Sequence, residues 1–279
     1  MLIDTHAHLN FSAYKDDIDE VIKRTLDNNI WVINVGSQST TSKRAVEMAE
    51  KYGQGVFAAV GLHPMHLEER KVDISEVDPQ NVFKTRAEEF DYGYYKELAQ
   101  NPKVVAIGEI GLDYYYKPKT KIKLEVFKKK QKDTFLQQLK LAKELNLPVI
   151  FHSRVAHKDL IGLLKDNPAV RPDKAVAHGF VGNLAELKEY LSFGYYIGVN
   201  GIIFKKIEGI DFEENIKYLP LDRIVVETDA PYLSPPRAGE RNEPLFIKYV
   251  VEEIARIKGV SREEIEEKTT QNAMELFSI

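Results

Sequence analysis

Histidines and carboxylates recur in this sequence at spacings that suit metal binding. His6 and His8 are two residues apart, and Glu227 and Asp229 have the same spacing. Side chains two residues apart on a β-strand point to the same face, so each pair can reach one centre. One such histidine pair is a weak signal, because a lone strand histidine more often makes an ordinary hydrogen bond. The chemistry therefore depends on how many of these residues meet.

Further residues of the same types end other short β-branched segments. They are His63, Glu109, His152 and His178. In enzyme barrels the catalytic groups come from the carboxyl ends of several strands. Imidazoles and carboxylates gathered at one rim would be a costly cluster of buried polar groups unless cations bound among them. We therefore expect a metal site made of His6, His8, Glu109, His152, His178 and Asp229.

The size of this ligand set favours two divalent metal ions. Imidazole and carboxylate suit zinc, manganese, nickel or magnesium, and six protein ligands exceed what one catalytic metal usually takes. We assign His6, His8 and Asp229 to the first ion, His152 and His178 to the second, and Glu109 as the bridge. Two such ions, about 3.5–4 Å apart, share a hydroxide and clamp substrate oxygens. Asp229 is also the expected general base.

Other residues near these positions are candidates for contacts with the substrate. We expect Arg154 either to bind a phosphate oxygen through its guanidinium group or to form a structural salt bridge. His63 faces the same mouth and can contact a phosphate or the metal-bound water. Arg237 and Arg241 follow the last strand, where barrels often bind phosphate, although either can instead cap the next helix. Glu227 either orients a ligand imidazole or makes a plain core hydrogen bond.

A lysine-rich stretch follows the segment that delivers Glu109. Residues Lys117–Lys132 include eight lysines. They form either a solvated helix face or a patch that attracts nucleic acid, in which case charge reversal at Lys128, Lys129 and Lys130 would flatten the salt dependence of DNA binding. Nearby tyrosines either pack or stack on unpaired bases. They are Tyr92, Tyr94, Tyr95, Tyr114, Tyr115 and Tyr116.

The elements that must position these residues alternate between strand and helix. Eight strands are expected at Leu2–Asp4, Ile30–Val35, Gly55–Val60, Val104–Glu109, Pro148–His152, Lys174–His178, Tyr195–Val199 and Arg223–Glu227. Helices are expected at Asp17–Asn28, Ser42–Tyr52, Leu124–Leu145, Lys158–Lys165, Ala185–Phe193 and Pro244–Lys258. This alternation predicts a parallel α/β sheet, and eight repeats favour a closed (β/α)₈ TIM barrel over an open doubly wound sheet.

Length fits one domain spanning residues 1–279, since single barrels run to about 250 residues. The segment Ser261–Phe277 begins with a capping-box pattern and predicts an extra helix outside the barrel. The segment His66–Gln100 is long for a connection between strands, so we expect an insertion at the barrel mouth.

Composition narrows the chemistry further. The chain has no cysteine, which excludes thiolate ligands and a cysteine nucleophile. Its formal charge of −4 neither supports nor excludes nucleic acid, which would need a local basic patch or bound metal. No secretory leader or long apolar run is apparent, so a cytoplasmic enzyme without a membrane partner is expected.

Several motifs together resemble the TatD family of metal-dependent deoxyribonucleases, within the amidohydrolase-like barrels. They are DTHAHL at Asp4–Leu9, GLHP at Gly61–Pro64, GEIGLDYY at Gly108–Tyr115, LPVIFHSR at Leu147–Arg154, HGF at His178–Phe180, VETDAPYL at Val226–Leu233 and RNEP at Arg241–Pro244. The resemblance implies a barrel with the same ligand set and phosphodiester hydrolysis, chiefly 3′→5′ exonuclease action on DNA. Where related amidohydrolases bridge their metals with a carboxylated lysine, this sequence has Glu109.

The leading hypothesis is therefore a phosphodiesterase acting on single-stranded DNA or frayed ends. A second hypothesis is a carbonyl hydrolase, such as an aminoacyl-tRNA deacylase, a lactonase or an amidase, because the same metal hydroxide attacks carbon. The arginines favour phosphate, whereas arginines remote from the metals would favour the carbonyl reaction. A non-catalytic binding protein is the third hypothesis, and the complete ligand set tells against it.

Overall fold

The computed structural model describes residues 1–69, 71–73 and 82–279. Eight strands follow one another around a barrel, and all neighbouring pairs are parallel. They are β1 (Leu2–Ala7), β2 (Ile30–Val35), β3 (Val56–Val60), β6 (Val104–Asp113), β7 (Val149–Arg154), β8 (Ala175–Ala177), β9 (Tyr196–Val199) and β10 (Ile224–Val226). This arrangement confirms the predicted (β/α)₈ barrel.

The first and last strands meet at their carboxyl ends. Ala7 and Ala230 form an isolated parallel bridge. The backbone N–H of His8 donates to Ala230 O at 2.7 Å, and that of Asp229 donates to His6 O at 2.8 Å. The backbone that closes the barrel is therefore the backbone that carries candidate metal ligands.

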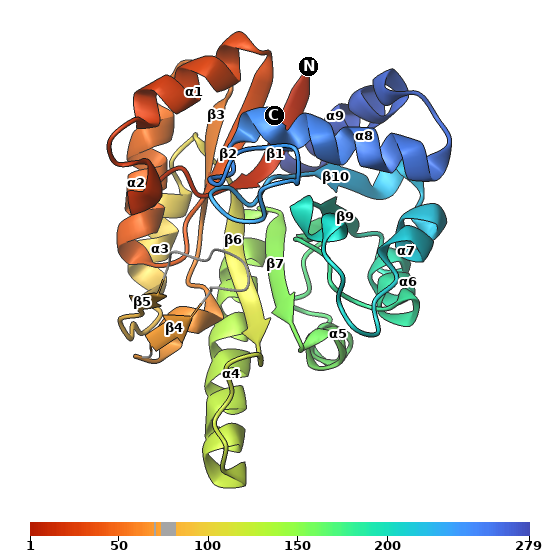
Figure 1. The fold of residues 1–279 in the computed structure, drawn as a ribbon. Coiled ribbons are helices and arrows are strands. Elements are labelled where there is room, and N and C mark those ends of the chain that lie inside the picture. The colour runs from red at the N-terminus through yellow and green to blue at the C-terminus, as the bar shows by residue number, and fades with distance from the viewer. Residues whose placement is uncertain (70, 74–81) are drawn as a thin grey trace.

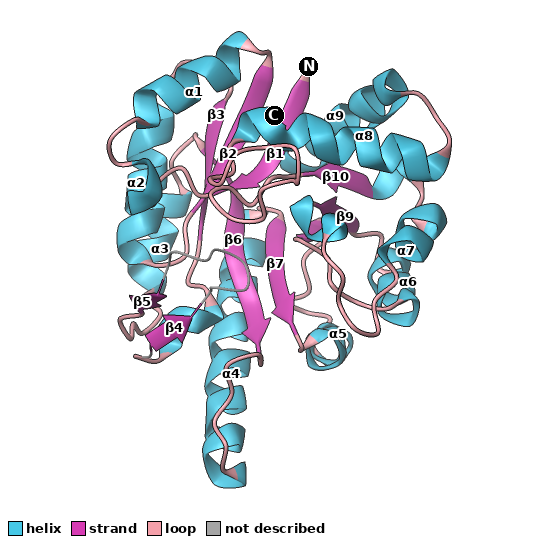
Figure 2. Cartoon of the chain, viewed as in Figure 1, coloured by secondary structure: helices cyan, strands magenta, loops and turns pink. Residues whose placement is uncertain are grey.

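Helices surround the strands, as Figure 2 shows. They are α1 (Ile18–Asp27), α2 (Ser39–Glu50), α3 (Tyr92–Ala99), α4 (Lys121–Leu145), α5 (His157–Asp166), α6 (Leu184–Ser192), α7 (Phe212–Tyr218), α8 (Ile247–Lys258) and α9 (Arg262–Phe277). Short 3₁₀ turns lie at Ser12–Tyr14, Pro64–Leu67, Gly201–Phe204, Leu221–Arg223 and Pro244–Phe246. Within the described part of the chain, no helix has the length and apolar character needed to cross a bilayer.

The strand β6 is longer than the sequence suggested. It continues past Glu109 to Asp113, because its second half pairs with β7 as far as Arg154. Gly111 makes this close pairing possible: its φ is +153°, and a Cβ there would lie 1.9 Å from the carbonyl oxygen of His152. The extension matters because it brings Asp113 beside β7.

The segment expected as an insertion has two parts. Its last part is α3, which contacts β3, β6 and α4 and so serves as the barrel helix between β3 and β6. Only the part before α3 is additional, and it includes the antiparallel pair β4 (Lys71–Asp73) and β5 (Val82–Lys84). Within that part, residues 70 and 74–81 lie outside the described residues. The helix α3 itself was not foreseen.

The C-terminal helix α9 begins as predicted, since the Ser261 side chain accepts a hydrogen bond from Glu264 N at 3.1 Å. It lies outside the ring of strands, as expected, but it covers the end of the barrel where β1 and β10 begin. Its Leu276 and Phe277 are buried with Ile3 and Val225 from the strands. Both side chains therefore close the amino end of the barrel, opposite the candidate site.

Candidate metal centre

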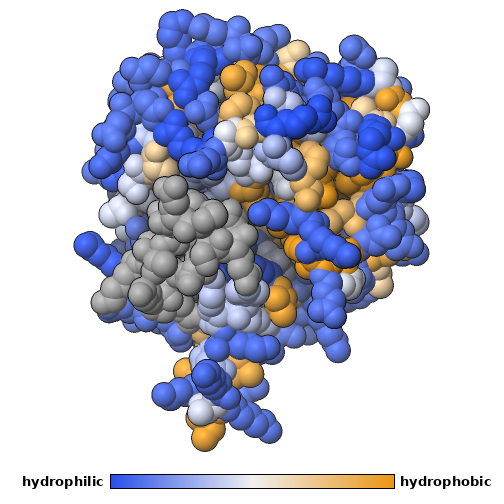
Figure 3. All heavy atoms as spheres, in the orientation of Figure 1, coloured by the Kyte–Doolittle hydropathy of each residue, from blue (hydrophilic) through white to orange (hydrophobic). Residues whose placement is uncertain are grey.

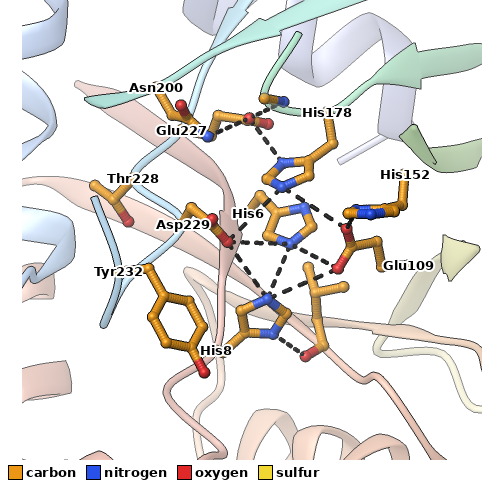
Figure 4. A network of polar contacts seen from close by, with 12 residues as sticks. His6, His8, Glu109, His152, His178, Asn200, Glu227, Thr228, Asp229 and Tyr232 are labelled. Atoms are coloured by element: carbon orange, nitrogen blue, oxygen red, sulfur yellow. Dashed lines mark hydrogen bonds and ion pairs between the residues drawn. The ribbon is translucent and has the colours of Figure 1, made fainter. Parts of the chain in front are cut away.

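The carboxyl ends of the strands bring all six predicted ligands together (Figure 4). They are His6 on β1, His8 just after it, Glu109 on β6, His152 on β7, His178 after β8 and Asp229 after β10. Glu109 Oε2 lies 3.9 Å from His8 Nε2, and Glu109 Oε1 lies 3.8 Å from His178 Nε2. The carboxylate of Glu109 therefore stands between two groups of histidines.

One group of donor atoms surrounds a common point. His6 Nε2 lies 3.2 Å from His8 Nε2, 3.6 Å from Glu109 Oε2 and 3.8 Å from Asp229 Oδ1. His8 Nε2 lies 3.5 Å from Asp229 Oδ1. Ligands about 2.0–2.2 Å from one tetrahedral metal stand about 3.3–3.6 Å apart, so these separations fit a single ion. The donor set, two imidazoles and two carboxylates, suits a divalent cation.

The second group uses the other oxygen of Glu109. His152 Nδ1 lies 2.6 Å from Glu109 Oε1, and His178 Nε2 lies 3.8 Å from the same atom. His178 Nε2 is also 3.7 Å from Asp229 Oδ1. The rings of His6 and His178 stack with their centroids 3.5 Å apart, which holds the two groups side by side. These residues could hold a second cation that shares Glu109 with the first.

Hydrogen bonds behind the rings fix which nitrogen faces the centre. His8 Nδ1 lies 2.8 Å from Val35 O, and a carbonyl only accepts, so Nδ1 carries the proton and Nε2 keeps its lone pair. His63 is the reverse case. Its Nδ1 accepts from Met65 N at 3.0 Å, which leaves the N–H of a neutral ring on Nε2, 3.6 Å from Glu109 Oε1. His63 is thus placed to donate a hydrogen bond at the centre.

A carboxylate orients His178, one of the two histidines of the second group. His178 Nδ1 forms an ion pair with Glu227 Oε1 at 2.7 Å, which is the orienting role that the sequence allowed for Glu227. Gly179 N also donates to Glu227 Oε1, at 2.6 Å. Gly198 leaves room for this side chain, since a Cβ there would lie 2.4 Å from Glu227 Oε2. An imidazole backed by a carboxylate is the usual arrangement behind a metal-binding histidine.

The protonation of the cluster follows from these pairs. Burial raises the pKa of Glu109, but the interactions with the imidazoles of His63 and His152 outweigh burial and hold this pKa well below its ordinary value. Burial also raises the pKa of Asp229, yet the neighbouring imidazoles of His8 and His178 outweigh burial and hold this pKa below its ordinary value. For His178, burial lowers the pKa, and Glu227 overcomes this to raise it to about 10. Both carboxylates are therefore ionised at neutral pH.

Sequence reasoning missed two carboxylates at the site. Asp113 Oδ2 lies 3.3 Å from His152 Nε2, on the side of the ring away from Glu109. Asp4 is fully buried and accepts from the backbone N–H of His6 and from Thr228, so it ties β1 to the turn that carries Asp229. Both belong to motifs already quoted. Asp113 lies four residues after Glu109, and Asp4 lies two residues before His6. Residues at even spacings on a strand share a face, so this was the available signal.

A third missed residue is His66, which was placed away from the site. Its ring lines the same cavity as His63, and its Nδ1 is buried without a hydrogen-bond partner among the described residues. Burial lowers the pKa of His66 to about 4, so its ring is neutral. No strand or helix periodicity in the sequence points to His66, because this residue lies in the 3₁₀ turn after β3.

The predicted substrate arginines separate into two groups. Arg154 lines the cavity, where it donates to Asp113 Oδ2 at 2.7 Å, so both its predicted roles remain open to it. Arg237 is 69% exposed and lies 3.5 Å from a carboxylate of α8. Arg241 forms ion pairs with Asp17 and Glu243. Neither Arg237 nor Arg241 lines the cavity, because acidic residues on neighbouring elements hold both of them.

The cavity above the cluster has a volume of about 1210 Å³, larger than the ~300–1,000 Å³ of small-molecule pockets. Cationic and aromatic side chains line it. The cationic ones are Arg44, Lys128, Arg154 and Lys158, and the aromatic ones are Phe11, Tyr114, Tyr115, Tyr116 and Tyr232. The guanidinium of Arg154 lies 4.6 Å from the ring centre of Tyr115, which is 42% exposed. Asp159, Glu186 and Glu208 also line the cavity, so the opening offers charges of both signs and ring faces beside the metal-binding groups.

Comparison with known proteins identifies the family. The profile described as TatD related DNase matches residues 3–278. "Uncharacterized metal-dependent hydrolase YabD" of Bacillus subtilis is 38% identical over the whole of both chains. "3'-5' ssDNA/RNA exonuclease TatD" of Erwinia amylovora is 31% identical, also over the whole of both chains. The crystal structure of the TatD homologue YjjV from Escherichia coli has a TM-score of 0.82 and 29% identity, and the match covers 100% of this chain and 98% of that one. This chain is therefore a metal-dependent hydrolase of the TatD family.

Proposed function

We propose that this enzyme removes nucleotides from the 3′ ends of single-stranded or frayed DNA by hydrolysing phosphodiester bonds. The observation that carries the proposal is the position of Glu109, whose two oxygens face separate groups of ligand atoms. A bridging carboxylate between two such groups suits a pair of divalent cations, which we infer to be zinc, manganese, nickel or magnesium. The name of the Erwinia amylovora relative supports both the substrate and the polarity.

The chain's own residues would divide the work as follows. His6, His8 and Asp229 would hold one cation, His152 and His178 would hold the other, and Glu109 would bind both. The cations supply Lewis acidity, which polarises a phosphoryl oxygen and activates water near neutral pH. Arg154 binds a non-bridging phosphate oxygen through its guanidinium group. His63 donates a hydrogen bond from Nε2 to the negatively charged oxygen atoms of the phosphate.

Asp229 acts as the general base. Its carboxylate is ionised at neutral pH, and its side chain is 16% exposed at the cavity floor, so the carboxylate can take a proton from the attacking water. The hydroxyl group of that water forms a bond to phosphorus. The bond from phosphorus to the 3′ oxygen of the preceding nucleotide then breaks, and Asp229 returns the proton to that leaving oxygen. A 5′ mononucleotide and a shortened strand result.

Hydrolysis of a carbonyl bond is the second candidate, and one observation favours it. Arg237 and Arg241 do not line the cavity, so two of the three arginines on which phosphate recognition was expected to depend lie elsewhere. Arg154, Arg44 and Lys158 do line it, and together with bound cations they would offset the acidic residues of the lining, which keeps phosphate as the better substrate.

The test incubates metal-loaded enzyme with 5′-labelled single-stranded DNA, with and without chelator. We expect a ladder of shortened products that chelator abolishes, and a loss of about 10²–10⁴-fold in Asp229→Asn. An ester substrate such as an aminoacylated tRNA serves as the comparison. Cleavage of the ester but not of DNA would assign the carbonyl reaction instead, and chelator-insensitive cleavage of DNA would refute the proposed mechanism.

A further inference from the structure

The helix α4 extends beyond the body of the protein on the side toward which β6 and β7 point (Figure 1). Its first turns pack against little: Ile122 is 81% exposed and Val126 is 64% exposed, whereas Phe127 is buried. We call residues 117–126 the basic arm. In Figure 3 the projecting end is covered mainly by hydrophilic side chains, with a few hydrophobic ones.

The lysines of the basic arm are exposed and available. They are Lys117, Lys119, Lys121 and Lys123. Within residues 1–69, 71–73 and 82–279, none of them has an ion pair or a side-chain hydrogen bond. Glu125 is the one acidic residue of Lys117–Lys132, although the whole chain carries a formal charge of −4. The arm is therefore a local concentration of unneutralised positive charge.

The lysines farther along α4 differ from those of the arm. Lys129 pairs with Asp133 at 2.5 Å, and Lys130 donates to Leu67 O at 2.7 Å. Lys128 and Lys132 both pair with Asp159 Oδ2, at 3.8 Å and 2.8 Å. The residues Lys128–Lys130, which the sequence suggested for charge reversal, are thus already engaged, and the arm is the better candidate for binding an anion.

The basic arm is continuous with the cavity. The strand β6 carries Glu109 and Asp113, the next residues Tyr114–Tyr116 line the cavity, and the arm follows them directly. A polymer whose end reached Glu109 could leave the cavity past Tyr115 and run along this segment. Because α4 rises about 1.5 Å per residue, its six residues within the arm span about 9 Å, and the residues before the helix lengthen this path away from the cavity.

We propose that the basic arm binds the sugar–phosphate backbone of the nucleic acid whose end occupies the cavity. This inference rests on the proposed function. Lysine is a point charge on a flexible stem, which suits contact with phosphates irrespective of base sequence. Each phosphate that a lysine neutralises releases a counterion, so the affinity depends on salt. The exposed Ile122 and Val126 lie one helical turn apart on the arm, where they can contact sugars or bases.

The test compares wild type with the variant Lys117→Glu, Lys119→Glu, Lys121→Glu, Lys123→Glu. Acidic residues near a helix N-terminus are favourable, so the thermal midpoint should be unchanged. A matched control reverses four other exposed lysines that do not line the cavity: Lys51, Lys140, Lys188 and Lys268. The probe is a fluorescent thymidine 20-mer with phosphorothioate linkages, titrated against metal-loaded protein at several salt concentrations.

We expect the arm variant to bind the 20-mer at least tenfold more weakly than wild type in 0.1 M salt. Its slope of log affinity against log salt should be shallower by about 0.7 for each phosphate that a lysine no longer neutralises, up to about 3 in total. The control, which has the same net charge, should keep the wild-type slope. Equal slopes for the arm variant and wild type would overturn the proposal.

A small diester separates this proposal from the proposed function. Bis(p-nitrophenyl) phosphate is too short to reach the arm, so the arm variant should hydrolyse it at the wild-type rate. If wild type hydrolyses neither this diester nor unmodified single-stranded DNA while the 20-mer still binds through the arm, the proposed function fails and the arm assignment stands. If the arm variant lost the binding of wild type to phosphatidylserine vesicles but bound the 20-mer as wild type does, the arm would be assigned to membranes and the proposal overturned.

Discussion

Asp113 Oδ2 lies 3.3 Å from His152 Nε2, directly behind the imidazole whose other nitrogen faces Glu109. The same oxygen accepts from Arg154 Nη2 at 2.7 Å. Asp113 Oδ1 accepts from the backbone N–H of Tyr115 at 2.9 Å. One buried carboxylate therefore orients a candidate metal ligand, a cationic side chain of the cavity and an aromatic residue at its mouth.

Replacing Asp113 should weaken both metal binding and catalysis. Asp113→Ala removes the partner of His152 Nε2, and loss of such a partner typically costs about 10–100-fold in metal affinity or activity. Calorimetric metal titration and steady-state kinetics measure the two effects. Asp166→Ala, at an exposed carboxylate, is the control and should change neither. If Asp113→Ala lowered only the thermal midpoint, Asp113 would have a purely structural role.

Arg154 and Arg241 should respond differently to substitution by alanine. Arg154→Ala should raise KM for DNA, because this side chain lines the cavity. It should also lower the thermal midpoint, because it removes the cationic partner of the buried Asp113 carboxylate. Arg241→Ala should leave KM unchanged and lower stability by about 1 kcal/mol, since it breaks partly exposed ion pairs with Asp17 and Glu243. Kinetics and thermal denaturation of both variants check this. A higher KM in Arg241→Ala would return Arg241 to the substrate site.

The pairing of β6 with β7 should depend on Gly111. Gly111→Ala would place a Cβ 1.9 Å from the carbonyl oxygen of His152. The backbone cannot shift to relieve this clash without moving His152, a candidate metal ligand. We expect a loss of stability above about 3 kcal/mol, together with loss of activity. Gly162→Ala is the matched control: a Cβ there meets nothing within 4 Å, so alanine in α5 should be neutral or slightly stabilising. Urea denaturation of both variants would show the difference.

Metal binding should release protons because His178 holds one in the metal-free protein. Glu227 overcomes the effect of burial and raises the pKa of His178 from 6.5 to about 10. The stability that this ion pair contributes is thus fully present below about pH 6.5 and is lost as pH rises through about 10. A metal at Nε2 must displace the proton at pH 8.

Calorimetric titrations of metal in two buffers with different ionisation enthalpies would count the released protons. Glu227→Gln is the control. Its neutral side chain no longer holds the proton on His178, so it should release fewer protons and should lose less stability between pH 7 and pH 10. An apparent enthalpy that does not depend on the buffer would contradict this prediction.

The sequence predicted the barrel and the gathering of ligands because both follow from local patterns. Alternating strands and helices predict the fold, and residues such as His6 and His8 lie at strand ends where a barrel collects its functional groups. Contacts between distant segments were not predictable. Nothing local shows that Asp17 lies beside Arg241, that Asp159 neutralises Lys128 and Lys132 of α4, or that β6 continues to Asp113.

The most direct test of the account is the position of bound metal relative to Glu109. Crystals grown with manganese or zinc, measured at the absorption edge of the metal, should show two anomalous peaks, one beside each oxygen of Glu109. The peak beside Oε2 should contact His6, His8 and Asp229, and the other should contact His152 and His178. A single peak, or peaks that Glu109 does not touch, would contradict the account.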